Sequence, residues 1–85
     1  MTEFARIYEK YSQLSSKEKE IIAAQLNGVR RIAAYEYAES GGVRHIDFVM
    51  DDGQTVHYFQ NTELWKAFVA LVESYHKRNS STMKK

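Results

Sequence analysis

The chain has 85 residues, of which 44% are hydrophobic and 27% are charged, and its formal net charge is +1. These values are typical of one small globular domain, and they argue against a dedicated nucleic-acid binder, which usually carries a marked basic excess. The sequence has no cysteine, no signal-peptide pattern and no stretch near the ~20 apolar residues of a membrane span. We therefore expect a cytoplasmic protein without disulfides or thiolate metal sites.

Two amphipathic helices are predicted at the start of the chain. Thr2 can cap the first helix, whose apolar residues are spaced three or four apart and are Phe4, Ile7, Tyr11 and Leu14. Ser15 and Glu18 fit a capping box at the start of the second helix. The apolar residues of this helix are Ile22, Leu26 and Val29. Asn27-Gly28 predicts its end, because glycine readily adopts the left-handed conformation of a helix C-terminus.

From Val29 onward the apolar period changes to two, which predicts three antiparallel strands. The strands are expected to be joined by a loop at residues 39–42 and by a turn at Asp51-Asp52-Gly53. A three-residue turn with Gly53 in the left-handed conformation is a common hairpin connection.

The loop lengths predict which residues face each other across the sheet, because register follows from the turn. A four-residue first loop places Glu36 opposite His45. The three-residue second turn places Asp47 opposite His57. It also places Phe48 opposite Val56 on the other face of the sheet.

A final helix is predicted from Glu63 to about Arg78, capped by Asn61 or Thr62. One apolar stripe comprises Leu64, Phe68, Leu71 and Tyr75, and a second comprises Trp65, Val69 and Val72. The polar residues 79–85 are expected to form a disordered tail. The predicted fold is one α+β domain over residues 1–78, a three-stranded antiparallel meander with helices in the order α-α-β-β-β-α.

One face of the predicted sheet and the apolar faces of the helices are expected to form the core. Its expected members are Phe4, Ile7, Tyr11, Leu14, Ile22, Leu26, Tyr35, Ile46, Phe48, Val56, Tyr58, Leu64, Phe68 and Leu71.

The other face of the sheet is expected to contact a partner protein through Glu36, His45, Asp47, His57 and Phe59. An aromatic anchor surrounded by polar groups is typical of interfaces, and Phe59 is the expected anchor. Two imidazoles and two carboxylates could also bind zinc or perform acid–base chemistry. An open three-stranded sheet offers no concave pocket, however, so we expect no catalytic residue, no metal and no cofactor.

The two stripes of the final helix together form an apolar face broader than one sheet contact requires, which leaves the second stripe, formed by Trp65, Val69 and Val72, without a partner on the sheet. These residues need cover from the first helix, the second helix or a second chain. Because exposed apolar patches commonly mark interfaces, we expect self-association through this stripe as a homodimer.

The segment Leu14 to Gly28, LSSKEKEIIAAQLNG, resembles the opening helix of LuxR-type helix-turn-helix domains. The resemblance covers fifteen residues and implies a DNA-binding regulator. Gly41-Gly42 then falls at the start of the recognition helix, where glycine disfavours helix.

The predicted α-β-β-β-α order over residues 16–78 is similar to that of double-stranded-RNA-binding domains. Gly42-Val43-Arg44-His45 also resembles the glycine-to-histidine loop of that family. The family holds phosphates with lysines at the start of its last helix, where this chain has Asn61-Thr62-Glu63-Leu64-Trp65 and Lys66 nearby.

The sequence favours a small non-catalytic protein-binding module. Compact domains of this size without catalytic motifs are often accessory or inhibitory proteins that contact a larger protein or complex, including those of phages and other mobile elements. The alternative is a nucleic-acid-binding module of the double-stranded-RNA-binding or helix-turn-helix type.

Overall fold

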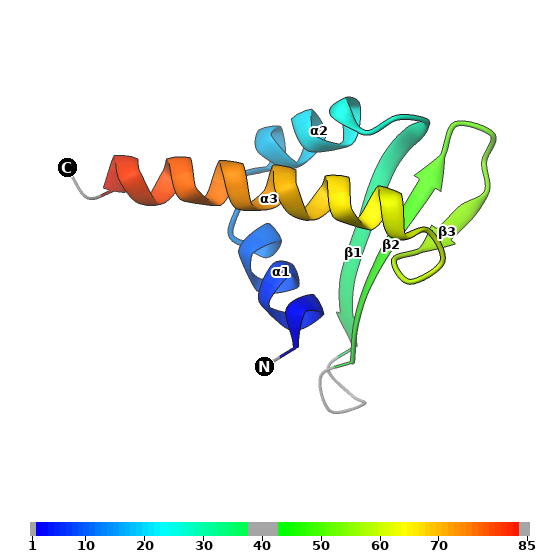
Figure 1. Cartoon of the computed structure of the whole chain (residues 1–85), viewed down its shortest axis with the longest axis horizontal. Coiled ribbons are helices and arrows are strands. Elements are labelled where there is room, and N and C mark those ends of the chain that lie inside the picture. The colour runs from blue at the N-terminus through cyan, green and yellow to red at the C-terminus, as the bar shows by residue number, and fades with distance from the viewer. Residues whose placement is uncertain (1, 38–42, 84–85) are drawn as a thin grey trace.

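The computed structural model describes residues 2–37 and 43–83, which form three helices and one antiparallel sheet (Figure 1). The elements in chain order are α1 (Glu3–Ser12), α2 (Ser16–Gln25), β1 (Val29–Tyr37), β2 (Val43–Met50), β3 (Thr55–His57) and α3 (Thr62–Met83). The strand order in the sheet is β1-β2-β3, which confirms the predicted α+β meander. Because residues 43–50 form a strand, the resemblance to helix-turn-helix domains does not extend to the fold.

The helix starts and the two turns form where the sequence predicts them. The Thr2 side chain accepts a hydrogen bond of 3.2 Å from the backbone N–H of Ala5, and Ser15 and Glu18 form a complete capping box. Gly28 and Gly53 have φ angles of 78° and 89°, a conformation that residues with a Cβ adopt reluctantly. Local chemistry therefore sets the boundaries of α1 and α2 and the position of the β2–β3 turn.

The predicted register of the second hairpin is confirmed. Asp47 pairs with His57, and Phe48 pairs with Val56. The backbone N–H of Met50 donates to the carbonyl of Gln54 at 2.8 Å, which closes the expected three-residue turn.

The predicted register of the first hairpin is wrong by one residue. His45 pairs with Tyr35 rather than with Glu36, which pairs with Arg44. A register shift between Val29 and Arg31 interrupts the alternation at the start of β1. A one-residue slip sends every side chain of a strand to the opposite face, so Tyr35, expected in the core, lies on the other face and is 37% exposed. The loop expected at residues 39–42 lies outside the described residues.

The core lies between one face of the sheet and all three helices. Ile46 and Phe48 of β2 are fully buried, and the rings of Phe48 and Phe68 meet edge-on with centroids 5.3 Å apart. The buried cluster also contains Ile7, Tyr11, Leu14, Ile22, Leu26, Val29, Leu64 and Val72. The helices therefore cover one side of the sheet (Figure 1), which we call the core face, and we call the opposite side the open face.

Most of the predicted core residues are buried in the structure. Phe4, Tyr58 and Leu71 are partly buried and pack against the cluster, and Val56 is also half-buried.

Helix α1 covers much of the second apolar stripe of α3. The ring of Trp65 stacks on Phe4 with centroids 6.0 Å apart, and its Nε1–H donates to Glu3 Oε1 at 3.3 Å. Val69 is half-buried against the core, and Val72 has no exposed surface. The expectation that Val72 contributes to a homodimer surface is therefore wrong, because the chain buries this residue itself. Trp65 is therefore contacted by α1, and Val69 packs against the core cluster.

Helix α3 runs five residues beyond its expected end at Arg78, through residues 79–83, which were expected to form a disordered tail. No glycine or proline stands between Arg78 and Met83 to stop the helix. Its C-terminal part projects past α1 and α2 (Figure 1). Within residues 2–37 and 43–83, no helix combines the length and apolarity that crossing a bilayer requires.

Candidate functional site

The open face of the sheet brings together most of the residues that the sequence singled out. The strand register assigns to this face Arg31, Ala33, Tyr35, His45, Asp47, Val49, Thr55 and His57. Phe59 follows two residues after His57, stacks on its ring and is 65% exposed. Four of the five predicted contact residues therefore gather here, from β2, β3 and the turn after β3.

Asp47 is the centre of this arrangement, and it is 6% exposed although it lies on the open face. Its Oδ2 accepts a hydrogen bond of 3.1 Å from the Tyr35 hydroxyl, and its Oδ1 lies 2.6 Å from His57 Nδ1. A carboxylate removed from water requires such partners, since burying a charge without them is strongly unfavourable. The rings beside Asp47 thus both shield the carboxylate and satisfy its two oxygens.

Aromatic rings form a row across the open face. Tyr35 and His45 stack with centroids 5.4 Å apart and an interplanar angle of 18°. The rings of His45 and His57 are 6.4 Å apart and tilted, and His57 stacks on Phe59 at 5.7 Å with an angle of 13°. The row thus consists of two stacked pairs of rings that meet at a tilt, with one carboxylate beside them.

Glu36 does not belong to this site, and the structure corrects that prediction. Its carboxylate Oε2 accepts a hydrogen bond of 2.7 Å from Arg44 Nε. The Arg44 guanidinium in turn lies 5.4 Å from the ring centroid of Tyr8 on α1. Burial, followed by the nearby Glu36 carboxylate, raises the pKa of the Tyr8 hydroxyl. Glu36 and Arg44 therefore contribute to an ion pair beside α1, on the opposite side of the sheet from His45.

Tyr35 is the residue of the site that sequence reasoning missed. The prediction placed it in the core because the alternation was assumed to be uninterrupted from Val29 onward. Val29 and Ile32 are three residues apart, yet both pack with the core. Such spacing is incompatible with an uninterrupted strand and is the sequence pattern that could have indicated the irregularity.

The donor atoms of His45, Asp47 and His57 can approach a common centre. One donor atom from each side chain lies within 4.8 Å of the other two. Two imidazole nitrogens and one carboxylate oxygen form a donor set that zinc and related transition metals accept.

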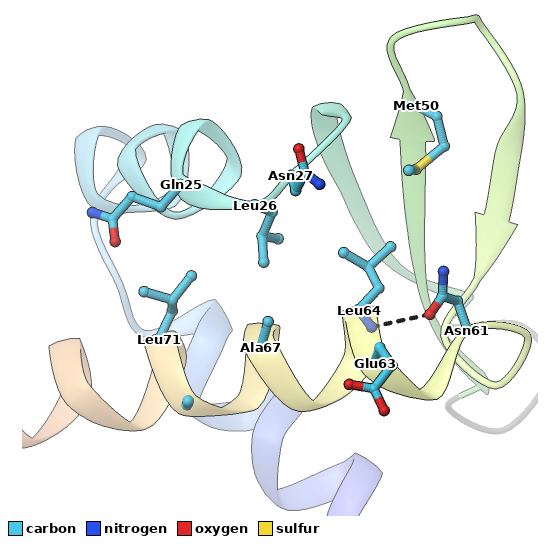
Figure 2. A pocket seen from close by; sticks show the side chains of 10 residues that line it. Gln25, Leu26, Asn27, Met50, Asn61, Glu63, Leu64, Ala67 and Leu71 are labelled. Atoms are coloured by element: carbon cyan, nitrogen blue, oxygen red, sulfur yellow. Dashed lines mark hydrogen bonds between the residues drawn. The ribbon is translucent and has the colours of Figure 1, made fainter.

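A pocket of about 590 Å³ lies on the other side of the molecule, between α2, α3 and the end of β2. Figure 2 shows Leu26, the residue directly after α2, facing Ala67 and Leu71 from α3, with Met50 and Asn61 at one end. Asn61 Oδ1 already accepts a hydrogen bond from the Leu64 backbone N–H at 3.1 Å. Glu63 is the only ionisable side chain in the lining, so the pocket offers apolar surface without a pair of acid–base groups.

A comparison of the chain with protein-family models, curated proteins and solved structures finds no match to any of them.

Proposed function

We propose that this protein is a small non-catalytic binding module that contacts a larger protein through its open face. The observation that carries the proposal is Phe59, which is 65% exposed and stacks on His57 at the edge of the ring row. Large exposed aromatic side chains surrounded by polar groups are typical of the residues that dominate binding energy at interfaces. The proposal of an accessory or inhibitory role in the cytoplasm rests on chain size and composition alone.

The ring row also supports a second candidate, the binding of single-stranded nucleic acid by base stacking. Such sites combine aromatic platforms with a positively charged groove. Among the strand residues that the structure describes, Arg31 is the only lysine or arginine whose register falls on the open face. The Asp47 carboxylate lies at the centre of this face and repels phosphates. Charge therefore favours a protein partner over a nucleic acid.

A photocrosslinking experiment tests the proposal. A photoreactive phenylalanine derivative at position 59 should form a covalent adduct with one protein in extracts of the native cell. The same group at Lys66, an exposed residue of α3, serves as the matched control and should not capture that protein. Capture of the same protein from both positions would contradict a specific role of the open face, and capture of RNA or DNA at position 59 would favour the second candidate.

A binding measurement with the purified partner completes the test. Phe59→Ala should weaken binding by more than about 1 kcal/mol, the usual threshold for an important contact. The melting temperature should remain nearly unchanged, because the Phe59 side chain is largely exposed. Lys66→Ala should leave binding as it is. Unchanged affinity of Phe59→Ala would remove Phe59 as the anchor.

A further inference from the structure

The three donor side chains of the open face lie on two neighbouring strands in a fixed relation. His45 and Asp47 are two residues apart on β2 and therefore point to the same face, and His57 of β3 is the cross-strand partner of Asp47. Their donor atoms all lie within 4.8 Å of one another. Strands position donors more rigidly than loops do, because each side chain's direction is set by the sheet.

The contacts around the triad hold its carboxylate in one orientation. The Tyr35 hydroxyl donates to Asp47 Oδ2 at 3.1 Å, which leaves Oδ1 directed toward His57 Nδ1 at 2.6 Å. The ring of His45 stacks on Tyr35. A hydrogen bond to the second oxygen of a ligating carboxylate is a recurrent feature of metal sites, because it orients the ligand.

We propose that His45, Asp47 and His57 bind one divalent transition-metal ion of the zinc class on the open face. Two imidazole nitrogens and one carboxylate oxygen favour zinc, cobalt or nickel over magnesium or calcium, which prefer oxygen ligands. Three protein ligands leave at least one coordination position for water or for a group from another molecule. Tyr35 acts as a positioning residue for the Asp47 carboxylate.

Binding requires only local movement of side chains. Donor atoms around a tetrahedral zinc with bonds of about 2.0–2.1 Å are about 3.3 Å apart, so the most separated donors must move closer by rotation. The side chain of His57 is 44% exposed and has room to turn. The metal would replace the hydrogen bond between His57 Nδ1 and Asp47 Oδ1, with the hydrogen of that bond released to water as a proton. It would also supply the positive charge that a buried carboxylate favours. The proposal does not depend on the protein-binding function, because it concerns only the chain's own donors.

The test is a titration of the purified chain with zinc chloride, followed by calorimetry and by NMR of the histidine rings. We expect saturable binding of one zinc ion per chain, with shifts in the ring signals of His45 and His57. His76 of α3 is the matched control, since it is the third histidine of the sequence and lies outside the triad, with its Nε2 beside Gln13 Oε1. Its ring signals should not shift, and magnesium should produce no heat.

Variants identify the ligands. His57→Ala and His45→Ala should each weaken zinc binding by at least about tenfold, and Tyr35→Phe should weaken it less than either. His76→Ala should bind zinc as the parent protein does. Circular dichroism verifies the fold of each variant. The two histidines are replaced rather than Asp47, because they are at least partly exposed whereas Asp47 is buried. Absence of saturable heat with the parent protein would overturn the proposal, as would full binding by His57→Ala or a loss confined to His76→Ala.

Discussion

Successive residues of β2 point to two faces that bury side chains in different ways. Ile46 and Phe48 on the core face have no exposed surface and belong to the apolar cluster. Asp47 between them is nearly as buried, at 6% exposure, but it lies on the open face among rings that bond to its oxygens. Burial on the core face removes apolar surface from water, which is favourable by itself. Burial of Asp47 is unfavourable without its partners.

Burial on the core face therefore stabilises the fold, whereas burial of the Asp47 carboxylate on the open face opposes folding unless its hydrogen bonds form. Packing on the core face depends on the shapes and volumes of its side chains, because contacts between apolar groups have no preferred direction. The open face depends on a few hydrogen bonds around one carboxylate. Substitutions on the two faces should therefore have effects of different size and different dependence on conditions.

The largest expected effect belongs to the core face. Phe48→Ala should lower the free energy of unfolding by about 3–5 kcal/mol, because it removes a fully buried ring and leaves a cavity. Phe68→Ala removes the opposing ring and should have a similar effect. Urea denaturation measures both losses. Phe59→Ala on the open face is the matched control and should change stability by less than about 1 kcal/mol. Equal losses for Phe48→Ala and Phe59→Ala would contradict the distinction between the faces.

The next effect concerns alkaline pH. Burial raises the pKa of the Tyr11 hydroxyl to about 12, whereas an unfolded tyrosine ionises near pH 10. The contribution of Tyr11 to stability is therefore fully present below about pH 10 and is lost as the pH rises toward 12, by at most about 2–3 kcal/mol.

Denaturation at about pH 9 and about pH 11 measures this loss in the parent protein and in Tyr11→Phe. Tyr11→Phe should be less sensitive to the change in pH. Identical pH dependence of Tyr11→Phe and the parent protein would show that the buried hydroxyl does not contribute.

An effect of comparable size is expected for the carboxylate of the open face. Asp47→Ala removes the acceptor for Tyr35 and the partner of His57, and it should lower the free energy of unfolding by about 1.5–3 kcal/mol. Asp52→Ala provides a control in the β2–β3 turn, where Asp52 accepts one hydrogen bond from the Gln54 backbone. Thermal unfolding should show the larger loss for Asp47→Ala. A rise in stability would mean that the desolvation of this carboxylate outweighs its hydrogen bonds.

The smallest effect is expected at the exposed ion pair between α1 and α3. The hydrogen bond of 2.6 Å from Arg6 Nη1 lowers the pKa of Glu73. The stability from this pair is thus present above the unfolded pKa of a glutamate and is lost as the pH falls through the lower folded pKa. Glu73→Gln should lower stability by less than about 1 kcal/mol at pH 7, since the pair is exposed. The difference in the free energy of unfolding between the parent protein and Glu73→Gln should vanish in acid. A difference that stays constant with pH would exclude the ion pair as its cause.

Sequence patterns predicted the parts of the fold that local chemistry determines. The caps at Thr2 and Ser15 act within one turn of helix, and the turn at Gly53 sets the β2–β3 register without help from the rest of the chain. The site residues on β2 and β3 were predicted for the same reason. His45, Asp47 and His57 follow directly from the phase of β2 and from a turn whose length was predicted correctly.

The first hairpin shows where such reasoning fails. Its register depends on a loop whose length the sequence leaves open and on the irregularity after Val29. A register error of one residue exchanged the faces of Tyr35 and Glu36. The prediction therefore placed Glu36 on the open face and Tyr35 on the core face, whereas the structure has them the other way round. The packing of α1 against Trp65 was left open for a similar reason, because helix–helix contacts depend on tertiary arrangement and not on periodicity.

The contact between α1 and α3 has a consequence for the order in which a newly made chain can fold. Synthesis proceeds from the N-terminus, so α1 leaves the ribosome long before the helix that covers it. Strands β1 and β2 are close in sequence and can pair earlier, since local contacts form faster than distant ones. Phe4 can stack on Trp65 only after the chain has been extended past that residue. Folding of the whole domain is then completed by one late step, the docking of α3.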